Sequence, residues 1–79
     1  MRVVNELVKE GIRISLFDWN NKYILKFELG NMEQTFKVPS MDVLEESDLE
    51  ALMEGQFFEE VKKRFDEMHK SLQKVTKNF

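Results

Sequence analysis

Few residues of this sequence could carry out acid–base or metal chemistry, and their spacing suits neither. His69 is the only histidine, and Asp66 lies three positions before it. An acid-x-x-His pair contributes to di-iron bundles only in two copies with further glutamates, and a three-His zinc site needs two more histidines. Ser71 follows His69 by two positions, and such residues do not face each other on a helix, which argues against a Ser-His-Asp triad. We therefore expect no catalytic residue, no metal site and no enzymatic activity.

Cofactor chemistry has no recognisable motif in this chain. The lack of cysteine removes disulfides, thiolate metal ligands and cysteine nucleophiles together. None of the three glycines lies in a glycine-rich phosphate loop. The acidic stretch 42–54 lacks the ligand spacing and the glycine of an EF-hand, and a solvated helix start explains it better. No cofactor is expected.

The residues that could bind a partner lie in one short segment. If the segment is a hairpin, Phe17, Trp19 and Ile24 share a face with Lys22 and Lys26. Aromatic side chains beside bases on a sheet can stack nucleobases and hold phosphates. The net charge of −3 argues against this use, because phosphate binding requires a positive surface. The alternative is that an N-terminal helix or a second copy of the chain covers this face.

The hairpin follows from a strict alternation of apolar and polar residues. Residues 12–19 and 22–29 both alternate, which is the pattern of a half-buried strand. Asn20-Asn21 suits the two-residue turn between them, since asparagine tolerates positive φ. A one-residue slip would exchange the two faces, so the register is strongly specified. The register pairs Arg13 with Glu28, Ile14 with Phe27, Ser15 with Lys26, Leu16 with Leu25, Phe17 with Ile24 and Trp19 with Lys22.

A second hairpin follows, with a turn that the sequence leaves open. A two-residue loop at Gly30-Asn31 would set Leu25 opposite Phe36, whereas a four-residue loop would set Phe27 opposite it. Pro39 ends the strand because it cannot donate to a ladder. The predicted meander therefore has three strands, at about 12–19, 22–29 and 33–38.

The N-terminal segment has apolar residues at helical spacing. They predict a short helix over about residues 2–10, with Gly11 as its C-cap. A strand is the competing interpretation, because three of the apolar residues are valines. The residues in question are Val3, Val4, Leu7 and Val8.

The C-terminal half predicts helices. Ser47 and Glu50 fit a capping box, and Gly55 either ends that first helix or kinks it. Beyond Gly55 a heptad stripe runs to Phe79, and it has two possible roles. It can pack against the sheet, or part of it can contact a second copy of the chain. The candidate dimer stripe is Phe58, Val61, Phe65, Met68 and Leu72.

Charge is segregated along the helical half. Residues 42–60 carry eight acids and no base, whereas residues 62–77 carry six bases and two acids. This order complements a helix dipole, and it would also favour an antiparallel pair of chains. No apolar run approaches the roughly 20 residues of a membrane span, and no leader peptide is recognisable, so a cytoplasmic location is expected.

Together these patterns predict a single α+β domain over residues 1–79. Its expected order is α-β-β-β-α-α, with the helices packed on the meander. So short a chain buries only about 60–65% of its unfolded surface, so it is expected to be marginally stable alone.

Two resemblances accompany this interpretation. The segments 17–23, 33–39 and 67–69 resemble a group of short bacterial proteins of unknown function, which implies no activity. A meander followed by a helix is also similar to the repeat of Pur-type single-stranded nucleic-acid binders. That repeat has four strands and a basic sheet, whereas three strands and an acidic total are expected here.

The sequence therefore predicts a non-enzymatic binding or assembly module that forms a homodimer. A further hypothesis is that the chain is a subunit of a larger complex with an unidentified protein partner. The main alternative is single-stranded nucleic-acid binding through the sheet.

Overall fold

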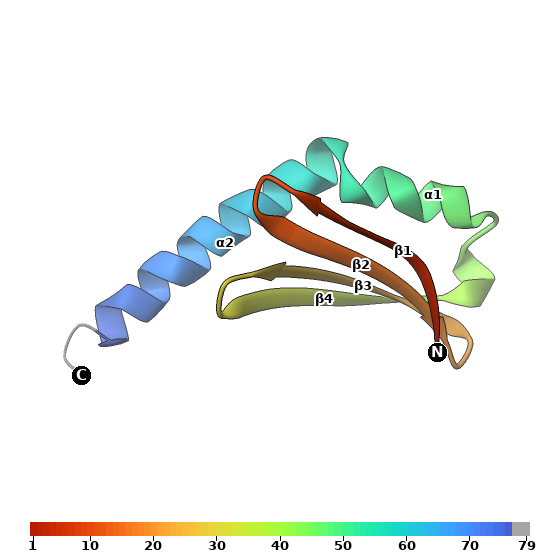
Figure 1. Ribbon diagram of the computed structural model, residues 1–79, viewed down its shortest axis with the longest axis horizontal. Helices are drawn as coiled ribbons and strands as arrows, with labels where there is room; N and C mark the ends of the chain where they lie inside the picture. Colours follow the sequence, from red (N-terminus) through yellow and green to blue (C-terminus); the bar gives the residue numbers. More distant parts are fainter. Residues whose placement is uncertain (77–79) are drawn as a thin grey trace.

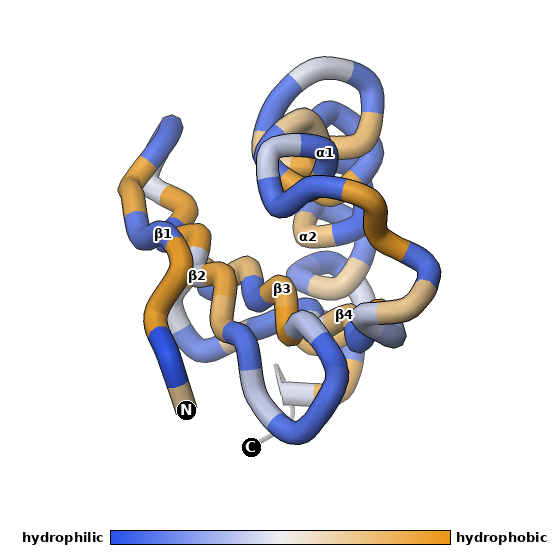
Figure 2. Tube along the Cα trace, turned by 90° about the vertical axis from the view of Figure 1, so that its right-hand side faces the viewer, coloured by the Kyte–Doolittle hydropathy of each residue, from blue (hydrophilic) through white to orange (hydrophobic). Residues whose placement is uncertain are grey.

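One antiparallel sheet and one layer of helices make up the described part of the protein. The computed structural model describes residues 1–76, and its four strands pair in chain order. The helices all lie on one face of the sheet (Figure 1), and the same two layers are seen end-on in Figure 2. The elements are β1 (Arg2–Lys9), β2 (Ile12–Trp19), β3 (Lys22–Leu29), β4 (Met32–Pro39), the 3₁₀ turn η1 (Ser40–Asp42), α1 (Glu46–Glu50), the 3₁₀ turn η2 (Ala51–Met53) and α2 (Gly55–Thr76).

The predicted order α-β-β-β-α-α is wrong at its first element. Residues 2–9 form β1, which pairs with β2, so the meander has four strands and the order is β-β-β-β-α-α. The pairing is irregular between Val3 and Asn5, where Val4 is the extra residue of a bulge. The bulge breaks the period of two and lets Val4 and Leu7 both pack against the core, three positions apart. A helix produces that same spacing, which explains the error.

The turns explain the registers. Glu10-Gly11 and Asn20-Asn21 have positive φ at both positions, as a type I′ turn requires. The predicted register of β2 against β3 is confirmed from Arg13↔Glu28 to Trp19↔Lys22. For the next hairpin the two-residue loop at Gly30-Asn31 is the observed one, and Leu25 lies opposite Phe36.

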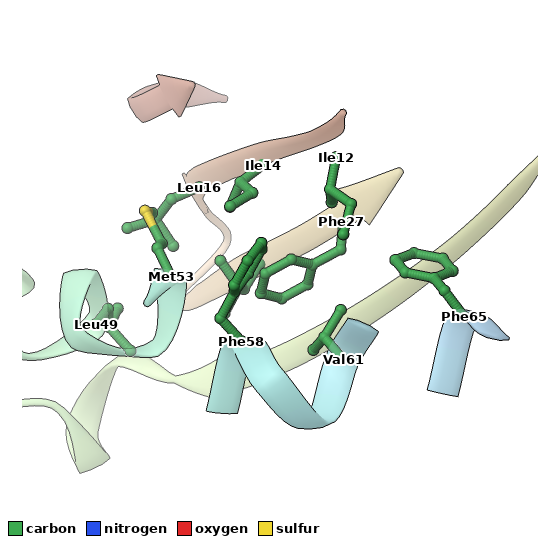
Figure 3. Packing of buried hydrophobic residues seen from close by; sticks show 10 residues of the cluster. Ile12, Ile14, Leu16, Phe27, Leu49, Met53, Phe58, Val61 and Phe65 are labelled. Carbon is green, nitrogen blue, oxygen red and sulfur yellow. The ribbon is translucent and has the colours of Figure 1, made fainter. Parts of the chain in front are cut away.

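The core lies between β2, β3 and the first half of α2. Phe58, Val61 and Phe65 point from α2 towards the sheet (Figure 3), and all three are almost completely buried. The Phe58 ring centroid is 6.5 Å from that of Phe27. Aromatic rings at this separation add modestly to the stabilisation from burial alone. The buried apolar residues are Ile12, Ile14, Leu16, Leu25, Phe27, Leu49, Met53, Phe58, Val61 and Phe65.

The short helical segments close one end of this core. Leu49 of α1 and Met53 of η2 are both buried. The capping box uses Glu45 as the N-cap with Asp48, and the pairing of Ser47 with Glu50 that the sequence suggested does not form. Gly55 has a φ of +71°, which a residue with a side chain rarely adopts, and it is the first residue of α2, just after η2 ends. Gly55 therefore breaks the helical half and does not merely kink it.

The second half of α2 extends beyond the sheet (Figure 1). Met68 still packs partly against the core, whereas Leu72 is 40% exposed and Val75 is 59% exposed. The last position of the predicted heptad pattern, Phe79, lies outside the described residues. Among the described positions of the stripe, the first half is therefore the part that packs in the core.

Replacement of Leu16 by alanine should destabilise the fold strongly. Leu16 is fully buried, whereas Leu44 is 96% exposed, so Leu44→Ala is a matched control. We expect Leu16→Ala to lower the free energy of unfolding by about 2–5 kcal/mol and Leu44→Ala by less than about 0.5 kcal/mol, both measured by urea denaturation. Equal losses in the two variants would contradict this packing.

Candidate partner-binding face of the sheet

The face of the sheet opposite the helices is uncovered by any element of residues 1–76 (Figures 1 and 2). Strand alternation and the registers place Phe17, Trp19, Lys22, Ile24 and Lys26 together on it, as the sequence predicted. The predicted covering by an N-terminal helix is wrong, because that segment is β1 and lies in the sheet itself. This uncovered face is the first candidate site.

An apolar band crosses the uncovered face. Val3 on β1, Phe17 on β2 and Ile24 on β3 are neighbours in successive strands, and Trp19 lies two positions further along β2. Phe17 and Ile24 are half-buried by their neighbours, while Trp19 is 46% exposed and Val3 is 55% exposed. An exposed apolar group of this kind is typical of an interaction surface.

The charges around the band largely neutralise one another. Arg13 Nε lies 2.9 Å from a Glu6 carboxylate oxygen, and this hydrogen bond, followed by the attraction between the charges, raises the pKa of Arg13. Lys26 Nζ lies 3.8 Å from Glu28 and 3.6 Å from Glu33. Each of these exposed pairs contributes little to stability, but together they leave the face nearly neutral.

Trp19 and Lys22 form a contact of another kind. The Lys22 ammonium lies 4.9 Å from the Trp19 ring centroid, within the range of a cation–π interaction. Lys37 lies on the same face, opposite Ile24, and forms no ion pair within the described part of the chain. The end of the face near Trp19 is therefore its most basic part.

A second candidate is a hollow between α2 and the two turns that join β1 to β2 and β3 to β4. Its volume is about 570 Å³, and it is floored by apolar side chains. The Lys62 ammonium at its rim lies 2.9 Å from Glu59 and 3.2 Å from Glu10, and these hydrogen bonds, that of Glu59 first, raise the pKa of Lys62. Asp66 pairs with Lys70 at 3.0 Å. Most of the rim's charges are already paired, so they select no ligand by charge.

The residues around His69 are divided between two hollows. His69 lines this hollow with Asp66, whereas Ser71 lines a different hollow beside Gln34 and Met68. Within residues 1–76 no three histidine, aspartate or glutamate side chains lie close enough together to bind a metal ion. No described helix is long and apolar enough to cross a membrane.

A third cluster of ionisable groups joins α1 to the sheet. Arg2 binds the carboxylates of Asp18, at 2.8 Å, and of Glu46, and the hydrogen bond to Asp18 contributes most to raising its pKa. The Tyr23 hydroxyl donates to Glu46 at 3.2 Å. Burial of the phenol, followed by the nearby Glu46 carboxylate, raises the pKa of Tyr23. These four groups hydrogen-bond to one another and hold α1 against the sheet, so we assign the cluster a structural role.

The candidate dimer stripe is divided by the fold. Phe58, Val61 and Phe65 are occupied inside the chain's own core, so a partner cannot reach them. Met68 is intermediate, and of the five predicted residues only Leu72 is exposed. Sequence reasoning missed Val3 and Val8 as part of the uncovered face, although the valine content of the segment was the available signal.

Comparison with models of known families, with curated proteins and with solved structures gives no match for this chain.

The Tyr23 contact predicts a pH dependence at high pH. The raised pKa means that the unfolded chain ionises first, near its ordinary value of about 10. Stability from Tyr23 is therefore fully present below that pH and is lost as the pH rises through the folded pKa. We expect urea denaturation at increasing pH to show a smaller loss of stability for Tyr23→Phe than for the unaltered protein. Identical pH profiles for the two proteins would contradict the assignment.

Proposed function

We propose that this protein is a non-enzymatic assembly module that self-associates through the uncovered face of its sheet. The observation that supports this most is the asymmetry of the sheet. One face is closed by α2, while the other presents Phe17, Trp19 and Ile24 with no element of the described chain over them. A chain with so little apolar core gains stability by burying a second face against a partner.

The size of the face limits the affinity. Four strands of eight residues cover about 19 Å by 27 Å, or about 500 Å² per copy. Two such faces give about 1,000 Å² in total, at the lower limit for a specific interface. A dimer of micromolar or weaker affinity is therefore expected.

The overhanging part of α2 is the competing surface for self-association. It exposes Leu72 and Val75, but the stripe residues before them are used in the core. Two exposed side chains one turn apart bury much less area than a whole sheet face. The sheet face is therefore the better-supported interface.

Sedimentation velocity from low micromolar to millimolar concentration tests self-association. We expect a monomer–dimer equilibrium that Ile24→Lys abolishes, because it places a charge in the apolar band. Leu72→Lys is the matched control on α2, and it should leave the dimer intact.

A monomer at every concentration would overturn the proposal. If Leu72→Lys removed the dimer while Ile24→Lys did not, α2 would be the interface instead. Circular dichroism of each variant shows whether a loss of dimer reflects a loss of fold.

A cytoplasmic location remains a prediction from the sequence.

The second candidate is single-stranded nucleic-acid binding through the same face. Exposed Trp19 beside Lys22 favours it, and the four strands remove one difference from the Pur-type repeat. The pairing of Lys26 and Arg13 with acids counts against it, because phosphate binding needs free cations.

Titration with a single-stranded oligonucleotide at low salt separates the two candidates. Trp19 is the only tryptophan and lies on the face, so stacking of a base on it would quench its fluorescence. We expect no change. Saturable quenching that weakens with added salt would favour nucleic-acid binding over self-association.

A further inference from the structure

The two central strands carry matching rows of side chains on the uncovered face. On this face the hairpin register sets Arg13, Phe17 and Trp19 of β2 beside residues of β3 with complementary character, and it sets Ser15 beside Lys26. The apolar pair is Phe17 with Ile24, and the cation–π pair is Trp19 with Lys22. At the other end of the hairpin, Arg13 lies opposite Glu28.

This match within one chain also makes the two central strands of the face complementary to a second copy of themselves. Consider a second copy rotated by half a turn about an axis that runs along the strands, between β2 and β3, in the plane of the interface. The rotation lays β2 of one copy over β3 of the other. It does not move residues along the axis, so each β2 residue comes to lie over the partner's copy of its own register partner on β3. Phe17 then faces the partner's Ile24, and Arg13 faces the partner's Glu28. Because the operation is symmetric, every contact occurs twice.

The other symmetric arrangement is less favourable. An axis across the strands lays β3 over β3, and overlap of the two apolar bands then sets Lys22 over the partner's Lys26. Like charges facing each other across an interface are unfavourable. The arrangement with the axis along the strands avoids this repulsion and stacks the sheets in the aligned manner of a β-sandwich, with an angle of about 30° between them.

We infer that the partner of the uncovered face is a second copy of this chain, docked with β2 over the partner's β3 about an axis along the strands. This inference rests on the proposed self-association and specifies its geometry. It assigns Arg13 and Glu28 as the charged pair that fixes the relative position of the two copies, while Phe17 and Ile24 form the apolar centre. Within one chain Arg13 pairs with Glu6 and Glu28 with Lys26, and in the dimer each also contacts its opposite charge on the partner.

The experiment is a charge exchange between two variants. In Arg13→Glu every dimer sets Glu28 against a partner glutamate, and in Glu28→Arg every dimer sets Arg13 against a partner arginine. A mixed dimer of the two variants restores both opposite-charge contacts. We expect each variant alone to dimerise at least about tenfold more weakly, and an equal mixture to recover the dimer. Native mass spectrometry identifies the mixed dimer, and sedimentation measures its affinity.

The control moves the same charges to a surface outside the interface. Lys63→Glu and Glu67→Arg change exposed residues of α2, so each should dimerise like the unaltered protein and mixing should change nothing. If either face variant fails to fold, Arg13→Gln and Glu28→Gln replace the pair. Each should weaken the dimer several-fold at low salt, and the difference should vanish at high salt.

The outcomes separate this inference from the proposed function. An unaltered protein that dimerises, with no recovery on mixing the two variants, overturns the arrangement and leaves self-association standing. An unaltered protein that is monomeric at every concentration overturns both. Recovery in the mixture alone supports the axis along the strands, because no other symmetric docking brings position 13 to position 28.

Discussion

The packing of α2 on one face of the sheet is the contact on which the rest of the structure depends. Phe58, Val61 and Phe65 close over Phe27, and without this layer the sheet would have no buried core. Residues 1–76 supply a single long helix, and one helix can cover only one face of four strands. The opposite face is consequently left to solvent or to a partner.

The uncovered face carries more apolar residues on its central strands than a solvent-exposed sheet face needs. A face meant only for solvent would carry polar residues at alternate positions, as much of β4 does with Glu33, Thr35 and Lys37. The central strands instead carry Phe17 and Ile24 there. Acids and bases surround these residues in nearly equal number, as in the polar rim of a protein–protein interface. Burial of the apolar band against a second copy would add stability in proportion to concentration.

The central hairpin could be predicted from the sequence because its information is local. The alternation of residues 12–29 and the asparagine turn specify the faces and the register without reference to distant residues. The N-terminal strand could not, because its bulge at Val4 mimics the spacing of a helix and its partner strand lies across a turn with Glu10 in an unusual positive-φ conformation. Non-local pairing overrode the local pattern.

The candidate site was predictable in part for the same reason. The residues of the apolar band follow from strand alternation, but their exposure depends on what packs on that face, which the sequence pattern does not state. The heptad stripe of α2 was also predictable only in part. Its periodicity predicts an apolar row correctly, whereas the point at which the helix leaves the sheet, near Met68, depends on the length of the strands beneath it. Position along one helix therefore divides core residues from exposed ones.

The emission spectrum of Trp19 over a dilution series tests the central claim most directly. Trp19 is the only tryptophan and lies half-exposed beside the apolar band. Self-association through this face predicts emission at longer wavelength in dilute solution and a shift to shorter wavelength as concentration rises, along the same curve as the sedimentation mass. An emission maximum that stays constant while the protein dimerises, or that stays constant with no dimer at all, would contradict the account.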